Sequence, residues 1–171
     1  MNESEKRLKQ LEVKLKGENV NLIMSTISSL REKEALKGVI RLLTGLYEVN
    51  ADPSLRKHIE EFMNDLKEST LRDEVISEIR IKEHKAETIK MLISSCWQSG
   101  LDYSAYASDF ALIFSICDLE TAIECFTVIE GFASLIPKKT KDHMIIIIKE
   151  HEKNRSKEKS VLMNELVSVL S

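Results

Sequence analysis

Three cysteines are the candidates for nucleophilic chemistry in this chain. Cys96, Cys117 and Cys125 are separated by 21 and 8 residues and form no CxxC motif. A reactive thiol needs a neighbouring base or positive charge that lowers its pKa. The stretch from Met91 to Leu135 that contains them carries acidic residues but no Lys or Arg. We therefore expect the cysteines to be small buried hydrophobic residues with no catalytic role.

Two pairs of residues have a spacing that could contribute ligands to a metal ion. His58 and Glu61 are three residues apart, which is half of the pattern in a carboxylate-bridged metal site, but a second such pair is missing. His143 and His151 are eight residues apart on one side of an expected helix, and they would need further ligands from another helix. We interpret both pairs as surface or helix-end residues and predict no metal ion and no cofactor.

Motifs that cradle phosphate or perform hydrolysis are absent. The sequence contains no GxGxxG, no Walker loop, no GxSxG and no HExxH. The prediction is a protein that is not an enzyme.

The stretch from Met91 to Leu135 has the most distinctive composition. It contains seven of the nine aromatic residues and six acidic ones. Trp and Tyr anchor interfaces because each joins a large apolar area to a polar tip. One interpretation is therefore a surface that receives a Lys- or Arg-bearing partner, formed by Trp97, Asp102, Tyr103, Tyr106 and Asp109. In the other interpretation Trp97 and Tyr106 fill the core and the acidic residues cap helices.

Charge and composition limit the classes of protein to which this chain can belong. Hydrophobic residues make up 43% of the 171 residues and charged ones 31%, with a net charge of −3, as in ordinary globular proteins. The acidic centre of the chain argues against binding to nucleic acid, which favours a basic surface. The longest apolar run, Met144 to Ile148, is too short to cross a membrane. With an odd number of cysteines and no apolar leader after Met1, we expect a cytoplasmic protein.

Apolar residues recur at helical intervals along nearly the whole chain. After Asp52 and Pro53, which suit the start of a helix, the spacing of Leu55, Ile59 and Phe62 predicts one buried face. The pattern predicts nine or ten helices in one domain, 1–171. We assign residues 1–31 to N-terminal capping helices, 33–152 to central repeats and 157–170 to a C-terminal helix. The run Ile145–Ile148 could form a strand, but its flanks favour a helix that is buried all round.

Three segments resemble HEAT repeats, the helical hairpins of armadillo-type α-solenoids. Val39 to Met63 has an apolar helix, then Asp52-Pro53, then Leu55-Arg56 in the next helix. Leu71-Arg72 with Val75-Ile76 and the segment from Asp118 to Ile129 are weaker copies. In this pattern the Asp caps a helix and the Arg can link neighbouring turns. The resemblance implies an all-α, right-handed α-solenoid of about five antiparallel helical hairpins, with a HEAT-like superhelix.

The expected function is therefore a non-catalytic scaffold that binds another protein, with a basic partner favoured, through its acidic aromatic surface. The C-terminal helix could also pair with a second copy of the chain. One alternative is a nucleic-acid-binding or DNA-repair protein of the HEAT-like glycosylase type. Another is a closed bundle that holds an apolar ligand among its phenylalanines, Phe110, Phe114, Phe126 and Phe132.

Overall fold

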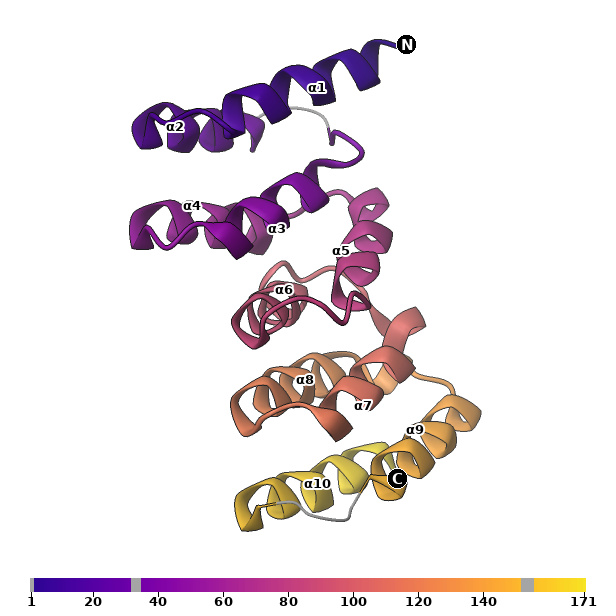
Figure 1. Cartoon of the computed structure of the whole chain (residues 1–171). Coiled ribbons are helices and arrows are strands. Elements are labelled where there is room, and N and C mark those ends of the chain that lie inside the picture. The colour runs from indigo at the N-terminus through magenta and orange to yellow at the C-terminus, as the bar shows by residue number, and fades with distance from the viewer. Residues whose placement is uncertain (1, 32–34, 152–155) are drawn as a thin grey trace. The chain divides into compact units, whose positions relative to one another are not determined.

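The computed structural model describes residues 2–31, 35–151 and 156–171, and within these ranges the regular elements are all helices, with no β-strand (Figure 1). The chain divides into two compact units, residues 1–88 and 89–171. The single domain predicted for residues 1–171 stays a prediction. Among the described residues no helix combines the length and the apolar character that crossing a bilayer requires.

The described residues of the first unit form five α-helices and the first turn of a sixth. Their bounds are α1 Glu3–Leu15, α2 Val20–Leu30, α3 Val39–Val49, α4 Pro53–Asn64, α5 Arg72–Ile79 and α6 Ala86–Gln98, with a short 3₁₀ helix at Ser69–Leu71 before α5. Helices α1 and α2 pack as one hairpin and α3 and α4 as the next. The second hairpin lies against the first, because α1 packs on α3 and α2 packs on α4. Helix α3 also packs on α5.

The start of α4 confirms the predicted helix-start signal. The Oδ1 atom of Asp52 accepts a hydrogen bond of 2.9 Å from the amide of Leu55, and Pro53 is the first residue of the helix. This bond satisfies one of the amides that the first turn of a helix leaves without an intrahelical partner. This local hydrogen bond therefore sets the residue at which α4 begins. On this helix Ile59 is buried and Arg56 is half-buried.

Arg56 links three helices of the first unit. Its Nε atom donates to the carbonyl of Asn50 at 2.6 Å and an Nη donates to the carbonyl of Tyr47 at 3.3 Å, at the end of α3. The guanidinium lies 4.7 Å from the centre of the Tyr47 ring. Both Nη atoms also bind Glu87 in α6, at 2.8 and 3.0 Å. The expectation that this arginine links neighbouring turns is confirmed.

The start of α3 has no cap from its own neighbourhood. Gly38 lies at φ 92°, a conformation that favours glycine. Its amide donates to the Oε1 atom of Glu74 in α5 at 2.8 Å. A Cβ atom at Gly38 would lie only 2.7 Å from the Cδ2 atom of Leu8 in α1. Three helices thus meet at one glycine.

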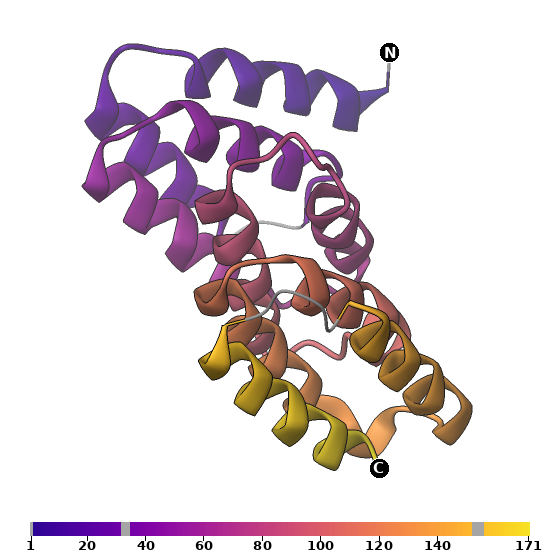
Figure 2. The same cartoon turned by 60° about the horizontal axis from the view of Figure 1, so that its bottom comes forward.

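The second unit repeats the hairpin arrangement. It contains the rest of α6, then α7 Ala107–Ile116, α8 Leu119–Phe132, α9 Lys138–Glu150 and α10 Lys157–Leu170, with short 3₁₀ helices at Ser104–Tyr106 and Ala133–Leu135. Helices α7 and α8 form a hairpin, and so do α9 and α10. Figures 1 and 2 show α7 beside α9 and α8 beside α10, as their contacts require.

Aromatic rings fill the centre of the second unit. Phe110 and Phe114 are fully buried on α7. The ring of Phe110 lies 6.2 Å from that of Tyr103, edge to face, and 6.0 Å from that of Phe132. Side chains of this size contribute strongly to the hydrophobic stabilisation of a core. The aromatic residues between Met91 and Leu135 are therefore mainly core residues.

Two details of the second unit differ from the sequence-based expectations, and a third agrees with them. Residues 145–148 are helical within α9 as predicted, but Ile146 is 54% exposed, so the run is not buried all round. The reason is that α9 packs mainly on α7 and α10 and leaves one side open. Asp102 caps no α-helix, since its Oδ1 accepts from the amide of Ser104 in the preceding turn. Asp118 does cap α8, through the amide of Thr121 at 2.8 Å.

Candidate functional site

Trp97 lies at the surface, near the end of α6. Its side chain is 45% exposed, although neighbouring Cys96 is buried. The indole Nε1 donates a hydrogen bond of 2.7 Å to the Oε2 atom of Glu124 on α8. An exposed indole held in place by a carboxylate presents its apolar face in a fixed orientation.

A second contact joins α6 to α8 on the same side. The ammonium of Lys90 lies 2.5 Å from the Oε2 atom of Glu120. Lys90 and Trp97 follow each other along α6 in the same order as Glu120 and Glu124 along α8, so the two helices run parallel here. Both partners are accessible, since the side chain of Lys90 is 40% exposed and that of Glu120 is 76% exposed. The pair is therefore weak and can be exchanged for other partners.

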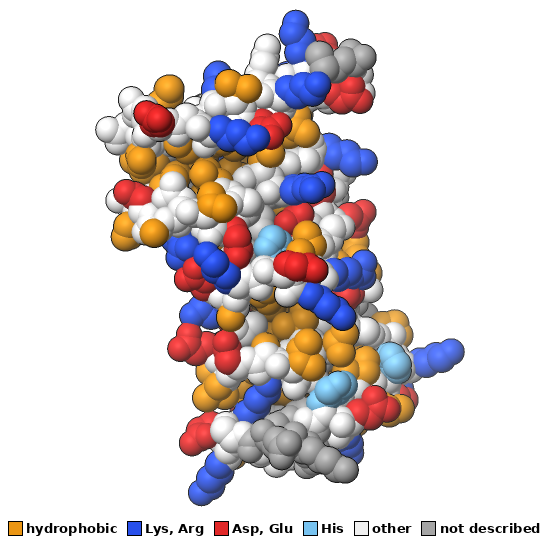
Figure 3. Space-filling model, viewed as in Figure 1, with side chains coloured by type: hydrophobic (Ala, Val, Ile, Leu, Met, Phe, Trp, Pro, Cys, Tyr) orange, Lys and Arg blue, Asp and Glu red, His pale blue; other side chains and the backbone are white. Residues whose placement is uncertain are grey.

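Ile123 lies between Glu120 and Glu124 in the sequence of α8, and 48% of its side chain is exposed. We refer to Trp97, Glu120, Ile123 and Glu124 as the Trp97 surface. It combines two apolar side chains with two carboxylates. Figure 3 shows acidic side chains next to hydrophobic ones on the part of the molecule formed by α7 and α8. Such a combination of an anchor and charge suits recognition of a basic, partly apolar segment.

The five residues predicted to bind a partner lie in different environments. Trp97 and Asp102 are exposed, and Tyr106 and Asp109 are half-buried. Tyr103 is fully buried, so its place on a binding surface is corrected. The structure brings the rings of Tyr103 and Tyr106 to 6.4 Å from each other. It joins Trp97 to Glu124, which the prediction did not include because the two are 27 residues apart.

The cysteines differ from their prediction in one respect. Cys96 and Cys125 are buried, and burial raises the pKa of each thiol. Cys117, however, is partly exposed at the end of α7. The carbonyl of Cys117 accepts a hydrogen bond from the ammonium of Lys159 on α10, whose side chain is buried. A positive charge thus reaches the cysteines from a helix that lies outside the stretch from Met91 to Leu135.

The histidines predicted to lie at surfaces bind backbone groups of their own helices. The Nδ1 atom of His58 lies 2.9 Å from the carbonyl of Ser54, and that of His151 lies 3.0 Å from the carbonyl of Ile147. His143 is exposed. Throughout residues 2–31, 35–151 and 156–171 no group of three or more His, Cys, Asp or Glu side chains is arranged to hold a metal ion.

A charged cluster in the first unit was not visible in the sequence. The Nε2 atom of His84 lies 3.1 Å from Glu78, and its Nδ1 atom lies 3.5 Å from Glu48. Burial opposes ionisation of Glu48, but hydrogen bonds from Thr88 and from the amide of Lys85 outweigh it and lower the pKa of Glu48. Because the two carboxylates bind opposite sides of the imidazole, the cluster joins α3, α5 and α6 and offers no common point for an ion.

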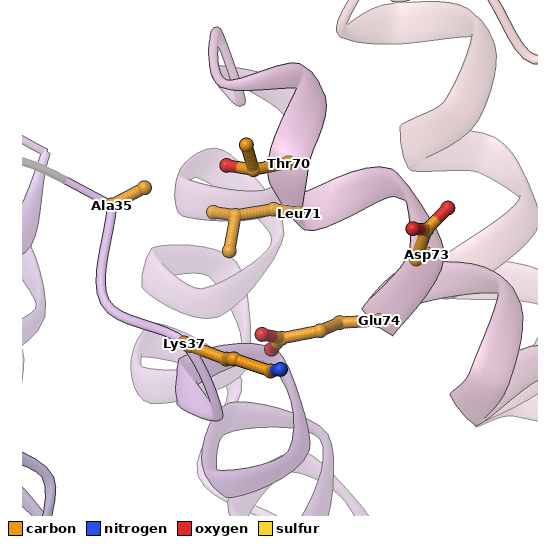
Figure 4. Close-up of a pocket in the computed structure, with 6 residues that line it drawn as sticks. All are labelled: Ala35, Lys37, Thr70, Leu71, Asp73 and Glu74. Atoms are coloured by element: carbon orange, nitrogen blue, oxygen red, sulfur yellow. The ribbon is translucent and has the colours of Figure 1, made fainter. Parts of the chain in front are cut away.

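A small pocket of about 280 Å³ lies beside α5 in the first unit. Lys37, before α3, and Glu74, on α5, extend into it from opposite sides (Figure 4). The other lining residues are Ala35, Thr70, Leu71 and Asp73. The lining has no histidine or cysteine, and the carboxylate of Glu74 also caps α3. The carboxylate of Glu74 therefore has a structural role at this pocket.

Comparisons with known proteins identify no relative. No family model matches the chain, and neither the curated proteins nor the solved structures contain a match.

Proposed function

We propose that this chain is a non-catalytic protein-binding module whose Trp97 surface receives a Lys- or Arg-bearing segment of another protein. The observation that carries the proposal is the half-exposed indole of Trp97, bonded to the carboxylate of Glu124. Tryptophan is among the residues most enriched in binding hot spots, because it joins a large apolar area to a polar tip.

The proposed mechanism uses the two kinds of group on this surface. A guanidinium or ammonium of the partner stacks on the indole, which contributes about 0.5–2 kcal/mol. The carboxylates of Glu120 and Glu124 supply the opposite charge, and the exposed ion pair of Glu120 with Lys90 is exchanged for a pair with the partner. Ile123 covers the apolar part of the partner segment. Asp102 and Asp109 add two more negative charges to the second unit, which also favour a basic partner.

The pairwise packing of hairpins supports the scaffold part of the proposal. In each unit the first helices of successive hairpins pack together, and so do the second helices, which is the arrangement of a helical-repeat stack. We therefore keep a right-handed, HEAT-like solenoid of about five hairpins as the proposed architecture. The three free cysteines support a reducing, cytoplasmic location.

The test uses the tryptophan itself, because Trp97 is the only one in the chain. A Lys- and Arg-rich helical peptide is titrated into the protein while Trp97 emission is recorded, with a charge-reversed peptide as control. We expect a saturable change with the basic peptide alone, and weaker binding as salt screens the charges. Emission that is unchanged, or that responds equally to both peptides, contradicts the proposal.

Variants locate the binding on α8. We expect Glu124→Gln and Glu120→Gln each to weaken binding of the basic peptide. The matched control is Glu130→Gln, because Glu130 is exposed on the same helix but is not part of the Trp97 surface. Equal losses in all three variants would show a general effect of negative charge and would remove the site.

The same titration with DNA tests the nucleic-acid alternative. Tight binding that weakens steeply with salt would favour it over the protein-binding proposal. Self-association through α10 is a further part of the proposal, supported by Val161, which is 53% exposed on that helix. Sedimentation at several concentrations that shows only monomer would remove it.

A further inference from the structure

Two thiols meet across the turn between α7 and α8. Cys117 is the residue at which α7 ends, and Cys125 lies on the buried face of α8. The two thiols interact with each other across the turn, because each one shifts the pKa of the other, although the residues are eight positions apart. The Sγ atom of Cys117 also donates to the carbonyl of Phe114 at 3.8 Å. This bond orients the Cys117 side chain at the end of α7.

The two thiols differ in access and in acidity. Cys117 is partly exposed, whereas Cys125 is fully buried. The hydrogen bond from Cys125 lowers the pKa of Cys117; burial opposes this, and the charge of Lys159 assists it. Burial raises the pKa of Cys125, and its hydrogen bond to Cys117 acts in the same direction. Cys117 is thus the thiol that ionises first and that a small reagent can reach.

Lys159 supplies the positive charge in a fixed position. Its side chain is 8% exposed, and its Nζ atom donates to the carbonyl of Cys117 itself. The carboxylate of Asp118 raises the pKa of Cys117, so it works against the lysine. A buried ammonium beside a cysteine pair, with one thiol accessible and one buried, is the environment in which thiols become reactive.

We propose that Cys117 and Cys125 form an oxidisable dithiol, in which a hydroperoxide oxidises Cys117 and Cys125 then closes a disulfide. In the first step the thiolate sulfur of Cys117 attacks the peroxide, so that an S–O bond forms and the O–O bond breaks. The sulfur loses two electrons to the peroxide, and the leaving hydroxide takes a proton from solvent. In the second step the sulfur of Cys125 attacks that of Cys117; its proton leaves with the hydroxyl as water. Two thiols and one hydrogen peroxide thus give one disulfide and two waters.

This site is separate from the Trp97 surface, so either proposal can fail alone. The reduced full-length chain is treated with hydrogen peroxide, and the remaining thiols are alkylated after denaturation and analysed by mass spectrometry. Trypsin leaves all three cysteines on one peptide, because no Lys or Arg lies between Met91 and Leu135. Cleavage after Glu120 and Glu124 separates Cys125 from the fragment that carries both Cys96 and Cys117, and fragmentation of the linked peptide in the mass spectrometer shows which of these two is joined to Cys125. A peptide linked through Cys117 and Cys125, with Cys96 still alkylated, is the expected result.

Variants test the order of the steps. In Cys125→Ser we expect a sulfenic acid on Cys117 that dimedone traps, and in Cys117→Ser no oxidation of Cys125. In the reduced wild-type protein we expect iodoacetamide to modify Cys117 about tenfold faster than Cys96. Lys159→Met should slow this reaction on the order of threefold, whereas Lys159→Arg and the exposed control Lys157→Met should not.

Three results would overturn the proposal. Peroxide could leave all three thiols free to be alkylated, it could pair Cys96 with another cysteine, or it could produce only disulfides between chains. The peptide map of the wild-type protein decides among them without any variant. Circular dichroism of each variant then shows whether a change in rate comes from the thiols or from loss of structure.

Discussion

Removing the side chain of Arg56 should destabilise the first unit by about 3 kcal/mol. The two hydrogen bonds to the carbonyls of Asn50 and Tyr47 contribute about 1 kcal/mol each. The guanidinium over the Tyr47 ring adds about 0.5–1 kcal/mol. The ion pair with Glu87 adds at most about 0.5 kcal/mol, because the side chain of Glu87 is 46% exposed and water screens the charges.

The measurement is urea unfolding followed by circular dichroism, with Trp97 emission as a separate probe of residues 89–171. We expect Arg56→Ala to lose about 3 kcal/mol and Glu87→Gln about 0.5 kcal/mol, in line with the contributions above. Arg41→Ala is the matched control, because Arg41 is an exposed arginine on α3. If Glu87→Gln costs as much as Arg56→Ala, the ion pair carries the stability and the assignment to the carbonyl groups is refuted.

Three further predictions concern the core and the response to pH. Phe110→Ala should cost about 3–5 kcal/mol in urea unfolding because it leaves a cavity in the second unit, whereas exposed Ile116 should tolerate alanine. The amide at the start of α8 lowers the pKa of Asp118, so its stabilising effect is full above the unfolded pKa and is lost as pH falls through the lowered value; Asp118→Ala should flatten acid unfolding. Burial, then the bond to Glu60, raises the pKa of Tyr47 to about 12. Its stabilisation is therefore lost as pH rises from 10 to about 12, and ultraviolet titration should find a tyrosine that ionises near pH 12 in the wild-type protein and is missing from Tyr47→Phe.

The helices could be predicted because their signals are local. The cap formed by Asp52 with Leu55, and that formed by Asp118 with Thr121, join residues three apart. Such contacts depend on the sequence of one turn and on no other part of the fold. The helical spacing of apolar residues predicts the buried face of each helix, and it too is read from one segment of the sequence.

The surface was harder to predict because burial depends on distant helices. Trp97 and Tyr103 are only six residues apart, yet one is 45% exposed and the other fully buried. Whether such a side chain is buried depends on whether another helix or loop covers it. The spacing of apolar residues within one helix does not contain this information. The contact of Lys159 with Cys117 spans 42 residues. No pattern around either residue indicates it, so the reactivity of the cysteines could not be judged from their neighbours.

Three helices meet at Gly38, so the exchange rate of its amide proton reports whether these helices unfold together. Its hydrogen bond to Glu74 breaks only when the contact between α3 and α5 opens, while Leu8 of α1 closes off the other side. If α1, α3 and α5 open as one foldon, this proton exchanges with deuterium at the rate of the slowest amides in the unit. A much faster rate would identify α5 as an element that detaches alone.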